Sequence, residues 1–198
     1  MTLWIMALSM KIFGIDEIAL RFPSIILSSI AIYFTYLIGR IIFSEKVGIL
    51  AAFFHAINGI IIELATGRTP TDHVDTIFFF FVELGILLSL LYKGKKSNHL
   101  LVFIGVVTGF TVLTKWLTGL LIIVVFLALH LKKGFFKIIF AKTSFVFLVS
   151  LIIFLPWQIY IYHVFPKEVP LAQSWYQSKI LRVFVTLVKT MTASRVLK

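Results

Sequence analysis

The sequence predicts an all-α fold: a polytopic transmembrane bundle of about six spanning helices, with an interfacial helix at each end. Three observations predict it. The 198 residues are 60% hydrophobic and only 14% charged, with 21 Phe, and the mean hydropathy is +1.05. Apolar segments of nearly spanning length follow one another along the chain. Lys and Arg collect at the ends of these segments, as anchors do at membrane surfaces.

A spanning helix needs about 20 apolar residues, and we expect six segments near that length. They are Phe22–Phe43, Val47–Thr66, Asp75–Tyr92, Leu100–Leu113, Leu117–Leu131 and Thr143–His163. The fourth and fifth are short and are joined at Lys115, which predicts a tight hairpin. One long buried segment is the alternative.

No repeat or flexible linker divides the chain, so we expect one partial membrane domain over residues 1–198. Residues 1–15 are predicted to form an interfacial helix and residues 16–163 the spanning helices. Residues 164–198 are amphipathic and basic, which favours a helix lying on the outer face. A seventh span that is cut short is the competing interpretation.

The formal charge of +11 does not indicate nucleic acid, because no basic groove interleaved with aromatic residues is visible. With the hairpin, the basic loops share one side, which the positive-inside rule makes cytoplasmic. That side holds Arg40, Lys46, Lys93, Lys95, Lys96, Lys132, Lys133, Lys137 and Lys142. The opposite side holds Asp16, Glu17, Arg21, Arg68, Asp72, Asp75, Lys115, Lys167 and Glu168. Without cysteine, disulfides and thiolate metal sites are excluded.

The polar run from Glu63 to Asp75, ELATGRTPTDHVD, is the first candidate site. Its carboxylates Asp72 and Asp75, with Arg68 and a histidine, are the groups needed to hold a divalent cation or a phosphate. Capping of the following helix, which Asp75 is expected to open, is the structural alternative. Lys115 at the hairpin tip either binds a phosphate or extends to water.

Polar residues within the apolar segments form a second set of candidates. A helical wheel places His55 and Asn58 on one side of the second segment, where we expect them to face the bundle interior. Glu83 lies about 12 Å deeper than Asp75 along its helix. The expected role of Glu83 is pairing with His55 or Asn58. A proton relay through Glu83 and His55, as in a small-solute transporter, is the functional alternative, although no discontinuous helix or inverted repeat is evident.

Four motifs in order resemble the dolichyl-phosphate-mannose protein mannosyltransferase family, including its bacterial relatives that transfer aminoarabinose to lipid A. They are a segment ending in FG before a helix opened by RFPS, a loop whose Asp starts a Phe-rich helix, the hairpin GVVTGFTVLTKW, and the span FLPWQIY. The resemblance covers about 170 residues and implies a helical bundle of GT-C type.

The resemblance implies transfer of a sugar from a polyprenyl-phosphate carrier to a protein or lipid acceptor, on the outer face of the lipid bilayer of a bacterial inner membrane. It implies that Asp75 and Lys115 bind the carrier, with Arg68 and Asp72 beside them. A divalent metal ion is the implied cofactor, with Asp75 and His163 as the residues offered for it.

The chain also departs from the family pattern. Family members carry an earlier span and an outer loop with an acidic pair, so we expect the catalytic base to lie upstream of Met1 and we assign no catalytic residue. Where the aminoarabinose transferases have a His and an Arg, this chain has Lys179 and Arg182, which weakens the metal assignment. The alternative function is a catalytically silent remnant or scaffold subunit that at most binds the carrier.

Overall fold

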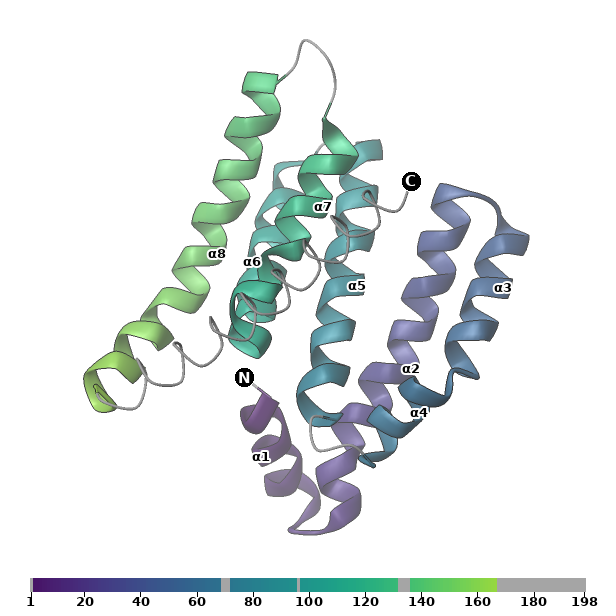
Figure 1. The fold of residues 1–198 in the computed structure, drawn as a ribbon, viewed down its shortest axis with the longest axis vertical. Coiled ribbons are helices and arrows are strands. Elements are labelled where there is room, and N and C mark those ends of the chain that lie inside the picture. The colour runs from purple at the N-terminus through teal and green to yellow at the C-terminus, as the bar shows by residue number, and fades with distance from the viewer. Residues whose placement is uncertain (1, 69–71, 96, 132–135, 167–198) are drawn as a thin grey trace, which may run out of the picture. The chain divides into compact units, whose positions relative to one another are not determined.

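The computed structural model describes residues 2–68, 72–95, 97–131 and 136–166, without the side chains of 72, 73, 94 and 95. Every secondary-structure element in this part of the chain is helical (Figure 1). The elements are α1 (Thr2–Phe13), α2 (Glu17–Ile42), α3 (Glu45–Ala56), α4 (Gly59–Thr66), α5 (Asp72–Lys95), α6 (Asn98–Lys115), the 3₁₀ helix η1 (Trp116–Leu120), α7 (Leu121–His130) and α8 (Phe136–Val164). The chain divides into two compact units, Met1–Phe154 and Leu155–Lys198.

Several helices are apolar and long enough to span a membrane, which confirms the predicted all-α polytopic bundle. The count of six spans stays a prediction. Within the described residues, four stretches pass by length and composition, and five do if α3 and α4 count as one bent span. One of the four is Asn98–His130, which contains the predicted hairpin. The interfacial position expected for residues 1–15 stays a prediction, although α1 is an apolar helix there. Of the predicted amphipathic segment 164–198, residues 167–198, with Lys179 and Arg182, lie outside the described residues.

The stretch predicted as one helix, Val47–Thr66, is broken, and the prediction of a continuous segment is wrong there. α3 and α4 meet at an angle of 54°. Asn58 caps α4, because its side-chain oxygen accepts hydrogen bonds from the backbone N–H groups of Ile60 (3.0 Å) and Ile61 (3.3 Å). Asn58 therefore stabilises the bend instead of facing a neighbouring helix. The discontinuous helix that the sequence did not reveal is present at this bend.

Residues 98–130 fold back on themselves, as the hairpin prediction required. Trp116 has a positive φ of 52°, which ends α6, and η1 then turns the chain. Leu101 on α6 and Phe126 on α7 belong to one buried cluster. A continuous helix would separate them by about 37 Å. The hairpin thus places α7 beside α6 (Figure 1).

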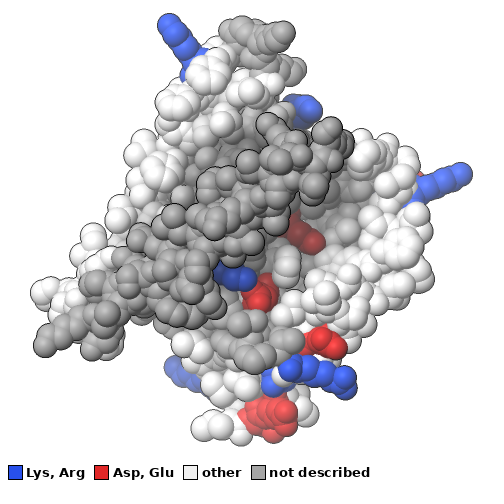
Figure 2. Space-filling view, viewed as in Figure 1, with Lys and Arg blue, Asp and Glu red and all other residues white. Residues whose placement is uncertain are grey.

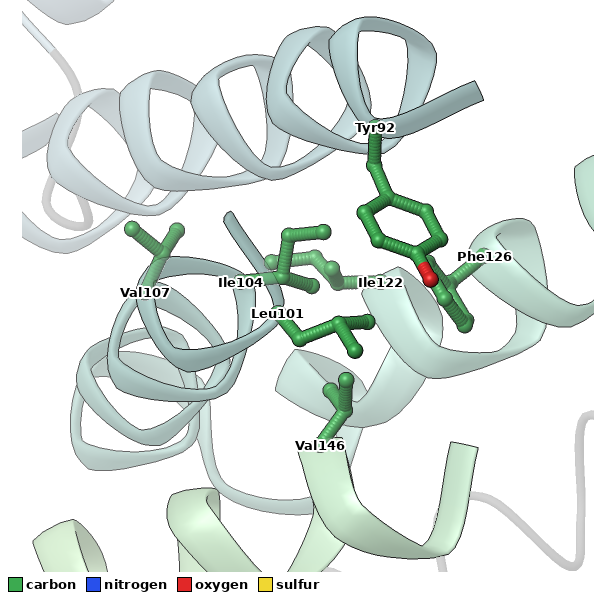
Figure 3. Packing of buried hydrophobic residues seen from close by; sticks show 7 residues of the cluster. All are labelled: Tyr92, Leu101, Ile104, Val107, Ile122, Phe126 and Val146. Carbon is green, nitrogen blue, oxygen red and sulfur yellow. The ribbon is translucent and has the colours of Figure 1, made fainter. Parts of the chain in front are cut away.

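The core of the first unit lies where α5, α6, α7 and α8 meet. Its buried members are Tyr92, Leu101, Ile104, Val107, Ile122, Phe126 and Val146 (Figure 3). Small residues allow close approach of the backbones, as is common in membrane bundles. A Cβ added at Gly105 would lie 2.6 Å from Val149 of α8, and one added at Gly39 would lie 2.8 Å from the Cα of Gly48.

The helices of the first unit begin and end at two opposite ends (Figure 1), and most charged residues of the described chain lie near these helix ends. We call one the Asp75 end: it holds the beginnings of α2 and α5 and the turn after α6. We call the other the lysine end: it holds Arg40, Lys46, Lys93, Lys137 and Lys142. On the face shown in Figure 2, most of the acidic side chains lie in the lower half. The partition expected from the hairpin is thus observed among the described residues.

Candidate functional site

The structure brings together the two residues that the sequence singled out most strongly, Asp75 and Lys115. Asp75 lies in the first turn of α5, and Lys115 is the last residue of α6, 40 positions later. The Lys115 ammonium donates a hydrogen bond to Oδ1 of Asp75 and forms an ion pair with it. The same ammonium lies 5.3 Å from the centre of the Phe78 ring, one turn further along α5. Lys115 is therefore held by a carboxylate and an aromatic face together.

The side chains of Lys115 and Asp75 differ in exposure, and this difference decides which of them an arriving ligand contacts. The Lys115 side chain is 42% exposed, whereas that of Asp75 is 17% exposed. The carboxylate thus holds the ammonium from the protein side and leaves its outer face open. An anion that arrives from outside meets the cation first.

The reversal after α6 positions Lys115 at this point. Gly119 in η1 packs directly on the end of α6, and a Cβ there would lie 2.4 Å from the backbone nitrogen of Val112. Only a residue without a side chain allows this approach. The tight turn therefore fixes the end of α6, and with it Lys115, against the first turn of α5.

The remaining predicted site residues are placed less closely. Arg68 follows α4; its side chain is exposed, and its backbone N–H donates to the carbonyl of Glu63 at 3.0 Å. Asp72 begins α5, three residues before Asp75, so Asp75 does not open its helix as expected. The side chain of Asp72 lies outside the described residues. His163 is exposed on α8 and belongs to the second unit.

The divalent metal ion stays a prediction, because the side chain of Asp72, three positions before Asp75, lies outside the described residues. Across residues 2–68, 72–95, 97–131 and 136–166, no three His, Asp or Glu side chains gather closely enough to hold one. Asp75 alone offers one carboxylate, and that carboxylate already holds an ammonium, which would repel a cation. No chemical step is therefore assigned to a metal.

A second polar cluster joins α2, α3 and α5 inside the bundle. The Thr35 hydroxyl donates to Oε1 of Glu83 at 3.1 Å, and Nδ1 of His55 lies 2.7 Å from the same hydroxyl oxygen. His55 Nδ1 and Glu83 Oε1 are 3.5 Å apart. Because the hydroxyl proton goes to Glu83, His55 Nδ1 is the donor toward Thr35. The predicted pairing of Glu83 with His55 is thus observed.

Sequence reasoning missed Thr35, which bridges this pair. A hydroxyl residue in the middle of an apolar helix is the signal that could have identified it, since such a group needs a partner away from water. His55 also lines a small cavity between α2, α3, α4 and α5. The other lining residues are Ser28, Ala31, Ile61, Leu64, Thr76 and Phe79.

Comparisons with known proteins agree with the resemblance drawn from the motifs. The family model described as dolichyl-phosphate-mannose-protein mannosyltransferase matches residues 1–160. An uncharacterized protein of Aquifex aeolicus (strain VF5) is 32% identical over 155 residues. The match covers 76% of this chain but only 30% of that protein. No solved structure matches the chain.

Proposed function

Because this chain belongs to the dolichyl-phosphate-mannose-protein mannosyltransferase family, we propose that it forms part of the membrane domain of a GT-C glycosyltransferase. In the proposed reaction a sugar passes from a polyprenyl-phosphate carrier to a protein or lipid acceptor. The carrier phosphate binds at Lys115. The observation that carries the proposal is the half-exposed side chain of Lys115, whose ammonium is held by Asp75 and Phe78 at one end of the bundle.

The proposed chemistry needs a cation at the carrier phosphate. The oxygen of an acceptor hydroxyl forms a bond to the anomeric carbon and gives up its proton to water, while the bond from that carbon to the phosphate oxygen breaks. The electron pair of the broken bond stays on the phosphate, whose negative charge grows as it leaves. A preorganised ammonium stabilises that charge more in the transition state than in the bound carrier. Lys115 is the residue for which we propose this role.

Asp75 serves as a positioning residue in this proposal. Its carboxylate fixes the Lys115 ammonium, and because it is engaged there we do not assign it the removal of the acceptor proton. Arg68 follows α4, and Asp72 is the first residue of α5. We propose that Arg68 contacts the phosphate as a second cation, since an Arg guanidinium suits phosphate geometry.

The Asp75 end is the outer face in this proposal. The lysine end carries most of the basic residues, and short basic loops stay on the cytoplasmic side of a bacterial inner membrane. Labelling of single cysteines introduced at positions 46 and 115 in intact cells tests the assignment. Position 115 should react with an impermeant reagent and position 46 should not.

Carrier binding tests the function directly. The full chain in nanodiscs is titrated with a radiolabelled polyprenyl-phosphate sugar, and Lys115→Gln is compared with Lys46→Gln, which removes the same charge at the opposite end. Loss of a charge-assisted contact of about 1.5 to 3 kcal/mol should weaken binding by about tenfold or more in Lys115→Gln. Equal binding by both variants and the parent would remove the proposal.

Binding without transfer is the second candidate function. It is favoured by the engagement of Asp75 with Lys115, which leaves that carboxylate without a free role in proton removal. Release of polyprenyl phosphate from the bound carrier distinguishes the two. Release in the presence of acceptor supports the transferase, whereas retention of intact carrier supports a silent carrier-binding subunit.

A further inference from the structure

We propose that the lysine end holds a binding site for the headgroup phosphate of an anionic membrane phospholipid. The site lies where the ends of α5 and α7 meet the beginning of α8. Its residues are Tyr92, His130, Lys93 and Lys142. It lies at the opposite end of the bundle from Lys115 and takes no part in the proposed transfer.

Two buried polar atoms at this point have no hydrogen-bond partner in the described structure: the Tyr92 hydroxyl and Nε2 of His130. Tyr92 is only 2% exposed. A buried polar atom without a partner costs about 1 to 3 kcal/mol, so such atoms usually indicate an ion, water or ligand. Two of them on adjacent side chains indicate a site that is completed by something else.

Aromatic packing fixes both groups in place. The Tyr92 and His130 rings have centres 5.3 Å apart, and the His130 ring stacks on Phe126 at 4.4 Å. Nδ1 of His130 lies 2.8 Å from the carbonyl oxygen of Phe126, which can only accept, so Nδ1 carries a proton. Figure 3 shows the Tyr92 side chain reaching from α5 toward Phe126 on α7. These two groups are therefore preorganised between α5 and α7.

Positive charge surrounds these two groups. The ammonium of Lys142 lies 5.4 Å from the centre of the Tyr92 ring. Lys93, the next residue after Tyr92, and Lys142 both act electrostatically on the His130 ring. No acidic residue lies within ten positions of Tyr92, His130 or Lys142 except Glu83. Glu83 is engaged with Thr35 deeper in the bundle. The Tyr92 hydroxyl can donate to an anion, whereas Nε2 of the neutral His130 ring accepts and needs a donor. Together with the two lysines, these groups fit an anionic headgroup that also carries a hydroxyl group.

The position along α5 identifies the anion as a lipid phosphate. The apolar stretch Val74–Lys93 ends at Tyr92 and Lys93, where a spanning helix reaches the headgroup layer. Basic pockets between helices on the positively charged side bind anionic headgroups. Lys142 now covers the Tyr92 ring, but its four-carbon side chain can move to the headgroup without any backbone change.

Lipid-dependent stability tests the site. The full chain is placed in nanodiscs of phosphatidylcholine alone or with increasing phosphatidylglycerol, and thermal unfolding is followed for Tyr92→Phe, Lys142→Gln and Lys137→Gln. Tyr92→Phe removes only the hydroxyl, and Lys137→Gln removes one charge from the same end of α8. We expect phosphatidylglycerol to raise the unfolding temperature of the parent and of Lys137→Gln. The half-saturating fraction of this lipid should rise at least fivefold in the other two variants.

Three results would overturn the proposal. In the first, Tyr92→Phe and Lys142→Gln respond to phosphatidylglycerol as the parent does. In the second, Lys137→Gln loses as much of the response as Lys142→Gln, which is expected if the lipid is attracted only by a diffuse surface charge. In the third, inorganic phosphate added to phosphatidylcholine nanodiscs would stabilise the parent as much as the lipid does. Native mass spectrometry gives an independent reading, since fewer retained phosphatidylglycerol molecules are expected for Tyr92→Phe.

Discussion

Replacing Gly119 with alanine should open the turn that holds Lys115 against Asp75. The added Cβ would lie 2.4 Å from the nitrogen of Val112, 2.5 Å from the carbonyl carbon of Thr111 and 2.7 Å from the Cα of Val112. These are backbone atoms of α6, which cannot rotate away as a side chain can. Ordinary contact begins near 3.4 Å, so η1 and α6 must separate by about 1 Å.

A forced separation of this size in a packed region costs about 1 to 3 kcal/mol. The assay is unfolding of the full chain in mixed micelles with increasing dodecyl sulfate, together with carrier binding. We expect Gly119→Ala to unfold earlier by this free energy. We also expect it to bind the polyprenyl-phosphate sugar several times more weakly, because Lys115 lies only four residues before the displaced glycine.

Gly59→Ala is the matched control. Gly59 is the first residue of α4, and a Cβ there meets nothing within 4 Å. Alanine is also the better helix former by about 1 kcal/mol, so this variant should be neutral or slightly more stable. If Gly119→Ala unfolds and binds carrier like Gly59→Ala, the argument that this glycine sets the hairpin is refuted.

Three further predictions concern single contacts. Thr35→Val keeps the shape of the side chain but removes the hydroxyl that donates to Glu83. The free energy of unfolding should fall by about 1 to 3 kcal/mol in the same micelle assay. An unchanged unfolding curve would contradict the bridging role of Thr35. Gly48→Ala should destabilise by about 1 to 3 kcal/mol, because its Cβ would lie 2.6 Å from a backbone oxygen of α2; equal stability would show that α2 and α3 separate freely. Asp75→Asn removes the carboxylate charge that fixes the Lys115 ammonium, so both stability and carrier affinity measured by titration should fall. Unchanged carrier affinity would mean that Asp75 does not position Lys115.

The sequence was sufficient for the helices and for the sorting of charge between the two ends. Long apolar segments bounded by Lys and Arg leave a backbone few alternatives in a bilayer, since only helices satisfy all its hydrogen bonds within one segment. The short segments on either side of Lys115 were also enough to predict a reversal. The same reversal placed Asp75 and Lys115 at one end of the bundle, because a hairpin returns the end of α6 to the end where α5 begins.

Other features depended on contacts between residues far apart in the chain. A helical wheel placed His55 and Asn58 on one face, yet Asn58 binds backbone N–H groups and bends the segment by 54°. A cap and a buried interhelical group have the same sequence signature, and only the local geometry separates them. Thr35 was missed because nothing in the neighbourhood of a single threonine shows which distant side chains it faces.

By itself, the order of apolar and charged residues determined that this is a helical membrane protein with a charged site at one end. In hydrocarbon each segment must satisfy its backbone hydrogen bonds by itself, so the residues of a segment are enough to predict whether it forms a spanning helix. The tertiary structure alone decided that Asp75 holds Lys115, that Thr35 bridges His55 and Glu83, and that Tyr92 and His130 lie together beneath Lys142. Such pairings depend on helix rotation and crossing, which glycines such as Gly39, Gly48 and Gly119 set through contacts between backbones.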